Sequence, residues 1–179
     1  MSQTAPGQPQ GGQDEQLPPL MVNIQFVKDL SFEVPGAPEI YTTLRAAPQV
    51  QLNLDVQARA LQEGGNVYEV TLAIRAEATE PAPGGAAAGA PGGNGGGNGA
   101  GRPVFLVELA YAGVFTLNGL PPDTIEPVLL VECPRLLFPF ARNVLADVTR
   151  EGGFQPVLLQ PIDFVSLWQS RRAAQPANA

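Results

Sequence analysis

From residue 50 to residue 60, every second side chain is apolar. The apolar positions are Val50, Leu52, Leu54, Val56 and Ala58, and the positions between them are Gln51, Asn53, Asp55, Gln57 and Arg59. Successive side chains of a β-strand point to opposite faces, so this alternation predicts a strand with one apolar face and one face in water. The apolar face needs cover from the rest of the fold.

Three further segments are rich in β-forming residues and predict strands over residues 21–34, 66–79 and 103–117. On one face of the first strand we expect Val22, Ile24, Phe26 and Lys28. The last strand is apolar on both faces apart from Glu108, so it needs cover on both sides. A turn signal at residues 63–66 joins the second and third segments, and the connections predict a meander.

The period changes after Asn118-Gly119. Apolar residues four apart predict an amphipathic helix that ends at Gly152-Gly153. Its apolar positions are Leu136, Phe140, Val144 and Val148, with Leu137 and Leu145 beside them. Residues 154–160 are extended, and Asp163 is expected to cap a short helix that contains Trp168. The predicted class is α+β, with a four-stranded antiparallel sheet followed by two helices.

Three segments are too poor in apolar residues to join a core. Residues 1–19 and 171–179 are predicted to be disordered tails, and residues 80–101, almost wholly Gly, Ala, Pro and Asn, a disordered insert within the hairpin of the third and fourth strands. The remaining residues, 20–170, are expected to form one domain. This modest core makes oligomerisation a plausible source of stability.

Composition excludes several functions. The 179 residues have a net charge of −7, no histidine and a single lysine, Lys28, which argues against nucleic acid as a partner. The commonest general base and metal ligand is missing, and no phosphate-binding loop with its lysine is present, so we expect no enzyme and no cofactor. Paired carboxylates remain open by residue type, and Cys133 at a helix start could have a lowered pKa, but a small packed residue is the favoured interpretation.

The N-terminal residues lack the basic and apolar runs of a signal peptide, and no apolar stretch is long enough to span a membrane. The lone cysteine is consistent with a reducing compartment. We therefore expect a cytoplasmic protein without membrane insertion.

Apolar side chains exceed what one small core can cover. Either subunits cover one another, or a groove accepts extended apolar peptides, and both can hold together. If the apolar faces serve only self-assembly, the chain is a subunit or adaptor that does not bind unfolded polypeptides.

Several runs resemble the SecB protein-export chaperone family in sequence and order. They are VKDLSFEVP at residues 27–35 with Ala37-Pro38, NVYEV at 66–70, FLVEL at 105–109 with GVF at 113–115, CPRLLFPFAR at 133–142, Gly153-Phe154, and PIDF at 161–164. The similarity covers residues 22–170, apart from the glycine-rich insert. That insert is long for the family, and Leu44 stands where an aromatic residue is often found.

The resemblance implies a homotetramer, built as a dimer of dimers, with helices sandwiched between sheets. It implies ATP-independent binding of unfolded precursor proteins and their delivery to the motor SecA. The implied SecA-binding residues are Asp29, Glu33, Leu106 and Glu108. The implied residues that bind unfolded precursors, here called clients, are Leu44, Val50, Leu52, Leu54, Phe105, Val107, Leu109, Phe138 and Phe140.

Overall fold

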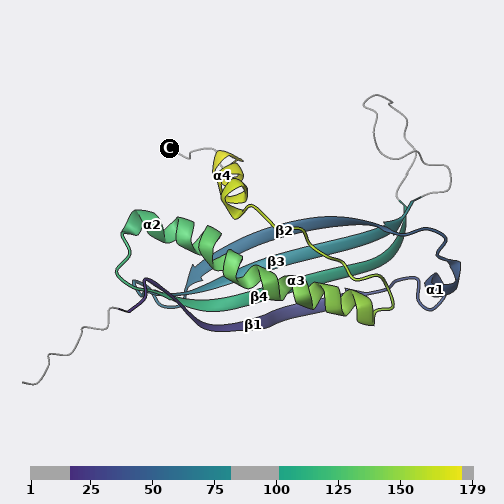
Figure 1. Cartoon of the computed structure of the whole chain (residues 1–179), viewed down its shortest axis with the longest axis horizontal. Coiled ribbons are helices and arrows are strands. Elements are labelled where there is room, and N and C mark those ends of the chain that lie inside the picture. The colour runs from purple at the N-terminus through teal and green to yellow at the C-terminus, as the bar shows by residue number, and fades with distance from the viewer. Residues whose placement is uncertain (1–16, 82–100, 175–179) are drawn as a thin grey trace, which may run out of the picture.

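A computed structural model describes residues 17–81 and 101–174. Four strands form one antiparallel sheet: β1 (Leu20–Glu33), β2 (Gln49–Ala60), β3 (Val67–Glu80) and β4 (Arg102–Leu117). Their order across the sheet is β1-β4-β3-β2 (Figure 1). The four predicted strands are confirmed. The meander is confirmed only for β2, β3 and β4, because β1 lies beside β4 and not beside β2.

β4 is a central strand, with β1 and β3 as its neighbours. The expected cover on both of its faces is found on one face only in the single chain, because the helices lie on one side of the sheet. β1 is an edge strand, and two register shifts interrupt its pairing with β4, between Val22 and Ile24 and between Val27 and Asp29. Each shift is a bulge that reverses the faces of the following residues. The prediction of Val22 and Ile24 on one face is therefore wrong: Val22 pairs with Phe115 and Ile24 with its neighbour Val114.

The helices that cover the sheet lie on one of its faces (Figure 1). A continuous helical segment comprises α2 (Pro122–Pro127), the π-helical turn η1 (Val128–Glu132) and α3 (Cys133–Glu151). Pro134 has no N–H to donate, which removes one helical hydrogen bond. The wider turn η1 ends at Glu132, two residues before this proline. The second predicted helix, α4 (Phe164–Ala174), is also confirmed.

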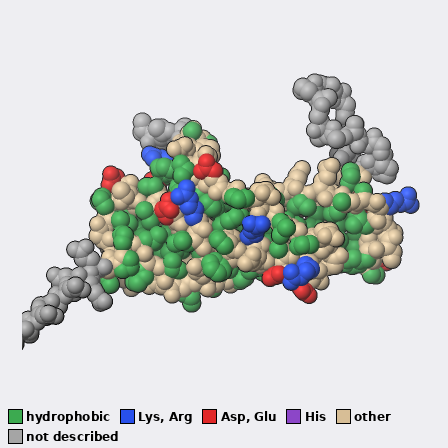
Figure 2. Space-filling view, viewed as in Figure 1, with side chains coloured by type: hydrophobic (Ala, Val, Ile, Leu, Met, Phe, Trp, Pro, Cys, Tyr) green, Lys and Arg blue, Asp and Glu red, His purple; other side chains and the backbone are tan. Residues whose placement is uncertain are grey.

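The buried face of α3 differs from the predicted one. The side chains that pack on the sheet include Leu137, Ala141 and Leu145, each with no exposed surface. Leu136 and Phe140, which the periodicity predicted as part of the apolar stripe, are 41% and 49% exposed. α3 therefore also exposes apolar side chains outside its packing on the sheet, and we call the part that carries Leu136 and Phe140 its outer side. Figure 2 shows apolar side chains spread over this face of the molecule.

One short helix and two element boundaries differ from the sequence predictions. A four-residue helix, α1 (Ile40–Thr43), was not predicted. Glu80 ends β3 and does not belong to an irregular insert. α4 continues to Ala174, so the first four residues of the predicted disordered tail, from Arg171, are helical. The predictions of disorder for residues 1–16, 82–100 and 175–179 lie outside the described residues.

The register divides the side chains of the sheet into two faces. The apolar residues of β2 pair with core residues of β3, for example Leu54 with Ile74 and Val56 with Leu72, and these lie on the helix-covered face. The polar residues of β2, such as Asn53 opposite Arg75, lie on the other face, here called the open face. The alternation over residues 50–60 therefore corresponds, as predicted, to a strand with one apolar face and one polar face.

Candidate functional site

An open cavity of about 660 Å³ lies on the helix-covered face, at the end of the sheet where β2 begins. Its walls are the connector of residues 44–48, the start of β2 with Val50 and Leu52, Phe105 of β4, and the loop of residues 153–158. We call this cavity the groove. Val50 and Leu52 are 37% and 46% exposed, so their apolar side chains are accessible in the single chain.

Two aromatic rings, those of Phe105 and Phe154, line the groove, and Phe32 and Tyr41 pack on them from outside it. The ring centroids of Phe105 and Phe154 are 4.9 Å apart, and those of Tyr41 and Phe154 are 5.4 Å apart in a stacked arrangement. Phe32 of β1 packs on both phenylalanines at 5.9 and 6.4 Å. The Tyr41 hydroxyl donates to the Gly152 carbonyl oxygen at 2.8 Å, which fixes α1 to the end of α3. Such rings offer large, rigid apolar surfaces to a ligand.

The C-terminal end of α3 positions the loop that closes the groove. Gly153 has a φ of 84°, which allows the chain to reverse there without a side-chain clash. The buried Thr149 hydroxyl donates to the Leu145 carbonyl oxygen at 2.9 Å and accepts the Val157 N–H at 3.0 Å. The wall formed by residues 153–158 is thus held by a side chain of the helix.

The predicted client-binding residues separate into three groups. Leu44, Val50, Leu52 and Phe105 line the groove. Leu54, Val107, Leu109 and Phe138 pack into or against the core and do not line it. Phe140 is exposed on α3 and stacks on Tyr111, with ring centroids 6.4 Å apart, away from the groove.

Sequence reasoning did not assign the loop of residues 153–158 to this site, nor Tyr41, which packs on Phe154 behind the groove lining. A signal was present in the loop, because Phe154, Val157 and Leu158 are apolar residues in an irregular segment between Gly153 and Pro161. Leu158 is 59% exposed. An apolar side chain left exposed beside an apolar cavity is typical of an interaction site.

The open face brings together the four residues predicted to bind SecA. Glu33 pairs with Leu106 and Ser31 with Glu108 across β1 and β4, and Asp29 lies opposite Ala110. Side chains at paired positions lie on the same face of a sheet. Asp29, Glu33, Leu106 and Glu108 are therefore neighbours on one surface, although they come from two strands far apart in the sequence.

Arg75 lies in the middle of this acidic surface. Its guanidinium group forms ion pairs with Glu108, directly across from it on β4, and with Glu77 at 3.5 Å. No salt bridge among the described residues involves Asp29 or Glu33. A hollow of about 310 Å³ lies on the same surface, lined in part by Asp29, Arg75 and Glu108. The open face thus offers both neutralised and unpaired carboxylates.

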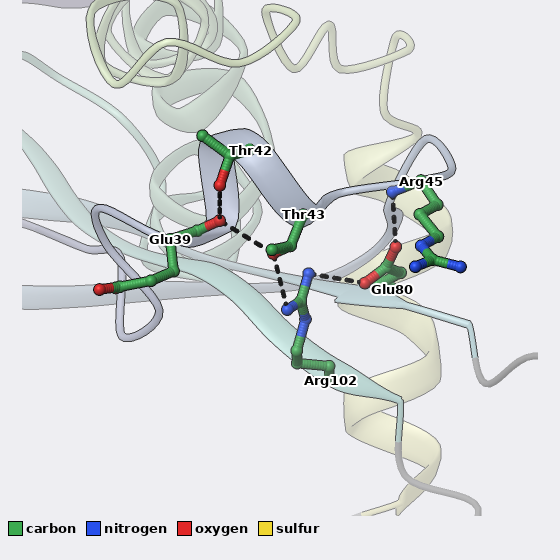
Figure 3. A network of polar contacts seen from close by, with 6 residues as sticks. All are labelled: Glu39, Thr42, Thr43, Arg45, Glu80 and Arg102. Carbon is green, nitrogen blue, oxygen red and sulfur yellow. Dashed lines mark hydrogen bonds and ion pairs between the residues drawn. The ribbon is translucent and has the colours of Figure 1, made fainter.

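A polar network joins the groove to the ends of β3 and β4 (Figure 3). Glu80 accepts the backbone N–H of Arg45 at 2.8 Å and forms an ion pair with Arg102 at 2.8 Å. Arg102 also donates to the Thr43 hydroxyl at 3.0 Å. The hydrogen bond from the Arg45 backbone, with the charge of Arg102, holds the pKa of the Glu80 carboxyl below its usual value.

The described residues contain little that supports catalysis. Cys133 is fully buried, and burial raises the pKa of its thiol to about 12, with a further contribution from the charge of Glu132. It therefore carries no reactive thiolate near neutral pH. No three acidic, cysteine or histidine side chains of residues 17–81 and 101–174 are grouped so that they could hold a metal ion. Within the same ranges, every helix is too short or too polar to cross a membrane.

Comparison with known proteins gives a consistent result. The family model described as preprotein translocase subunit SecB matches residues 13–175. The protein-export protein SecB of Granulibacter bethesdensis is 62% identical over 172 residues, which are 96% of this chain and 90% of that protein. The SecB protein of Acidiphilium cryptum is 65% identical over 160 residues, which cover 89% of this chain and 93% of the relative.

A solved structure has a similar fold at low sequence identity. It is the SecB-like chaperone Rv1957 of Mycobacterium tuberculosis in complex with a ChAD peptide from the HigA1 antitoxin. The match has a TM-score of 0.58 and 12% identity, and it covers 80% of this chain and 91% of the solved chain. At this identity the similarity concerns the fold alone.

Proposed function

This chain belongs to the SecB family of protein-export chaperones, which are not enzymes, and we propose that it holds unfolded precursor proteins in the cytoplasm and delivers them to the SecA motor. The observation that carries the proposal is the open apolar groove with aromatic rings on one side. A folded ligand would present few apolar side chains to it, whereas an unfolded chain presents many.

The groove suits a weak and general mode of binding. Burying one large apolar side chain contributes about 1.5–3 kcal/mol, while immobilising each flexible side chain costs about 0.5–1.5 kcal/mol. Each contact therefore gives a small net gain, and several contacts along an extended segment are needed for capture. Such binding depends on apolar content and not on a defined sequence, which suits a chaperone of many precursors.

The proposal is tested by the refolding of a slow-folding precursor mixed with this protein at equal concentration, without ATP. Ligands that bind the unfolded state lower its free energy, so refolding slows by mass action. We expect clear retardation that is independent of nucleotide. Refolding at an unchanged rate contradicts the proposal.

A matched pair of variants localises the effect. Leu52→Ser removes an apolar side chain that lines the groove and is 46% exposed. Leu61→Ser removes one of similar exposure, 42%, that follows β2 at the opposite end of the strand. Retardation should weaken in the first variant and persist in the second. Equal weakening in both would mean that the groove is not the client site.

The open face is proposed as the SecA-docking surface. Unpaired carboxylates on a flat sheet attract a basic partner and act mainly on the association rate and on specificity. Asp29 and Glu33 offer such charges, and Leu106 provides an apolar contact beside them. Because the groove is on the opposite face, one chain can hold a client and meet SecA at the same time.

Charge reversal separates the two activities. We expect Asp29→Lys, Glu33→Lys and Glu108→Lys together to weaken SecA binding and to leave client capture nearly intact. The control reverses three exposed acids away from both the open face and the outer side of α3, Glu39, Glu63 and Asp123, which gives the same change in net charge. Equal loss of client capture and SecA binding in the open-face variant would refute the assignment.

We also propose that four chains assemble as a dimer of dimers. The outer side of α3, with Leu136 and Phe140, and the edge strand β1, with Val27 and Leu30, leave large apolar side chains exposed. Large apolar side chains that are exposed together are typical of an interface between chains. Second copies of this chain supply that cover, because helices packed between two sheets bury the outer side of α3.

A further inference from the structure

The connector of residues 44–48 forms one wall of the groove without regular secondary structure. Among the described residues, its backbone is held before β2 begins by the Leu44 N–H, which bonds the Ile40 carbonyl oxygen at 3.0 Å, and by the Arg45 N–H, which bonds Glu80 at 2.8 Å. The first bond is the end of α1. The second is a contact to a different part of the chain, and it determines where the wall lies relative to the sheet.

Glu80 is itself fixed in place. Its side chain is only 15% exposed, and the carboxylate oxygen that does not accept from Arg45 pairs with Arg102 at 2.8 Å. Glu80 and Arg102 are also paired in the β3–β4 ladder. Arg102 reaches the Thr43 hydroxyl, which in turn donates to the Glu39 carbonyl oxygen at 2.9 Å. Figure 3 shows these groups converging from α1, the connector and both strands.

We propose that Glu80 is a positioning residue of the client groove, whose carboxylate holds the connector wall at the distance from residues 153–158 that an extended apolar segment requires. This inference rests on the proposed function. A carboxylate suits the task because it accepts a backbone N–H and an arginine at the same time, through charge-assisted bonds that are shorter and stronger than neutral ones. Arg102 and Thr43 keep the carboxylate in a single orientation.

Glu80 does not contact the client in this account. Its loss leaves the apolar lining of the groove unchanged and releases only the position of Leu44 and its neighbours. Client affinity should therefore fall, while SecA binding, which uses the opposite face of the sheet, should not change. A residue that supported only the overall fold would affect both activities together.

The test compares wild type with Glu80→Ala, Glu80→Gln and, as a control, Glu63→Ala, an exposed acid in the turn between β2 and β3. Four quantities are measured: hydrogen exchange of the Arg45 amide, the Kd for a denatured precursor, the Kd for SecA, and the denaturation midpoint. In Glu80→Ala, we expect exchange at Arg45 to accelerate and client affinity to fall, each by about tenfold, the equivalent of one charge-assisted hydrogen bond. SecA affinity should stay as in wild type, and the denaturation midpoint should fall only by what the loss of one hydrogen bond from the folded state explains.

The isosteric Glu80→Gln variant keeps an acceptor for the Arg45 N–H and loses the ion pair, so its effects should be intermediate. Faster exchange at Arg45 with unchanged client affinity would overturn the inference, as would unchanged exchange. So would a fall in SecA affinity that parallels the fall in client affinity. A wild-type protein that binds no denatured precursor would instead refute the proposed function, and the exchange rates would still report whether Glu80 holds the connector.

Discussion

Glu69 lies on the open face of β3, yet its side chain is only 6% exposed. Lys28 of β1 donates to it at 2.9 Å, and Arg59 of β2 pairs with its other oxygen. One carboxylate therefore ties together three of the four strands. The hydrogen bond from Lys28 is the largest cause of a lowered pKa for Glu69, and the bond from Arg59 acts in the same direction against the effect of burial.

Replacing Glu69 by Gln tests this link. The folded pKa lies below the ordinary value of 4.5, so the stabilisation is complete above about that pH and is lost as the pH falls through the folded pKa. We expect Glu69→Gln to lower the free energy of unfolding by about 1 kcal/mol at neutral pH, since both cations are partly exposed. Denaturant titrations from pH 7 to pH 3 measure the difference. A difference that stays constant over this range would contradict the account.

Gly113 allows α3 to approach β4 closely. A Cβ atom there would lie 2.9 Å from Cδ2 of Leu137 on α3 and 2.8 Å from a ring carbon of Phe115. Both neighbours are fully buried, so neither can move without disturbing the core. The contact between helix and sheet therefore depends on a residue without a side chain.

Gly113→Ala should lower the free energy of unfolding by about 1–3 kcal/mol through overpacking. The control is Gly36→Ala, where the added Cβ would meet Ile40 at 3.5 Å, an ordinary contact, so the expected change is within about 0.5 kcal/mol. Urea denaturation of both variants measures the difference. Equal stability of the two variants would argue against close packing at Gly113.

At the scale of elements, α4 is attached to the edge strand β2 by one arginine. Arg171 donates to the carbonyl oxygens of Val56 and Leu54 at 3.0 and 3.3 Å and pairs with Asp55. These bonds occupy backbone acceptors on the outer edge of β2, which an edge strand otherwise leaves free. Trp168 adds a second contact, because its indole N–H donates to Glu126 of α2 at 3.0 Å.

Arg171→Gln should release α4 from β2 and leave the sheet intact. Trp168 is the single tryptophan of the chain, so its fluorescence reports on α4 directly. We expect stronger quenching by acrylamide in Arg171→Gln and no change in Arg150→Gln, which removes an exposed ion pair on α3. Unchanged quenching in Arg171→Gln would mean that the Trp168–Glu126 bond and apolar contacts hold α4 without Arg171.

The elements that sequence reasoning predicted correctly are those with long periodic patterns. The four strands have runs of alternating or uniformly apolar residues, and α3 has a clear helical period. The errors arose where the sequence contains no periodic pattern that could predict the structure. A bulge at Asn23 changes the face of later residues without changing composition, and α1 is too short for a period. Periodicity does not show which apolar residues of α3 are buried, because burial depends on which side of the helix contacts the sheet.

For the site, the family resemblance and not strand alternation singled out the four residues of the open face. The structure brings them together on one surface, and their role in SecA binding stays a prediction. Within the apolar set, sequence did not separate groove residues such as Leu52 from core residues such as Val107, because both are apolar positions on the helix-covered face. That distinction depends on which positions α3 covers and which remain under the loop of residues 153–158.

For the whole molecule, the proposed assembly would cover the exposed apolar side chains of α3. A chain of 18.8 kDa that assembles as proposed should show a native mass about four times that value in light scattering. Charges placed on the outer side of α3, as Leu136→Glu with Phe140→Glu, should reduce the mass toward that of a dimer, since a buried unpaired charge is costly. A monomeric wild-type protein would contradict the proposed architecture.

The central claim is that the groove itself captures unfolded polypeptide. The most direct measurement is photocrosslinking of a denatured precursor to a photoreactive residue placed at position 158, in the groove wall, or at position 61, outside it. Leu158 and Leu61 are both exposed, at 59% and 42%, so both labels are accessible. The account predicts strong crosslinking from position 158 and little from position 61. Equal yields at the two positions, or no product from position 158, would contradict it.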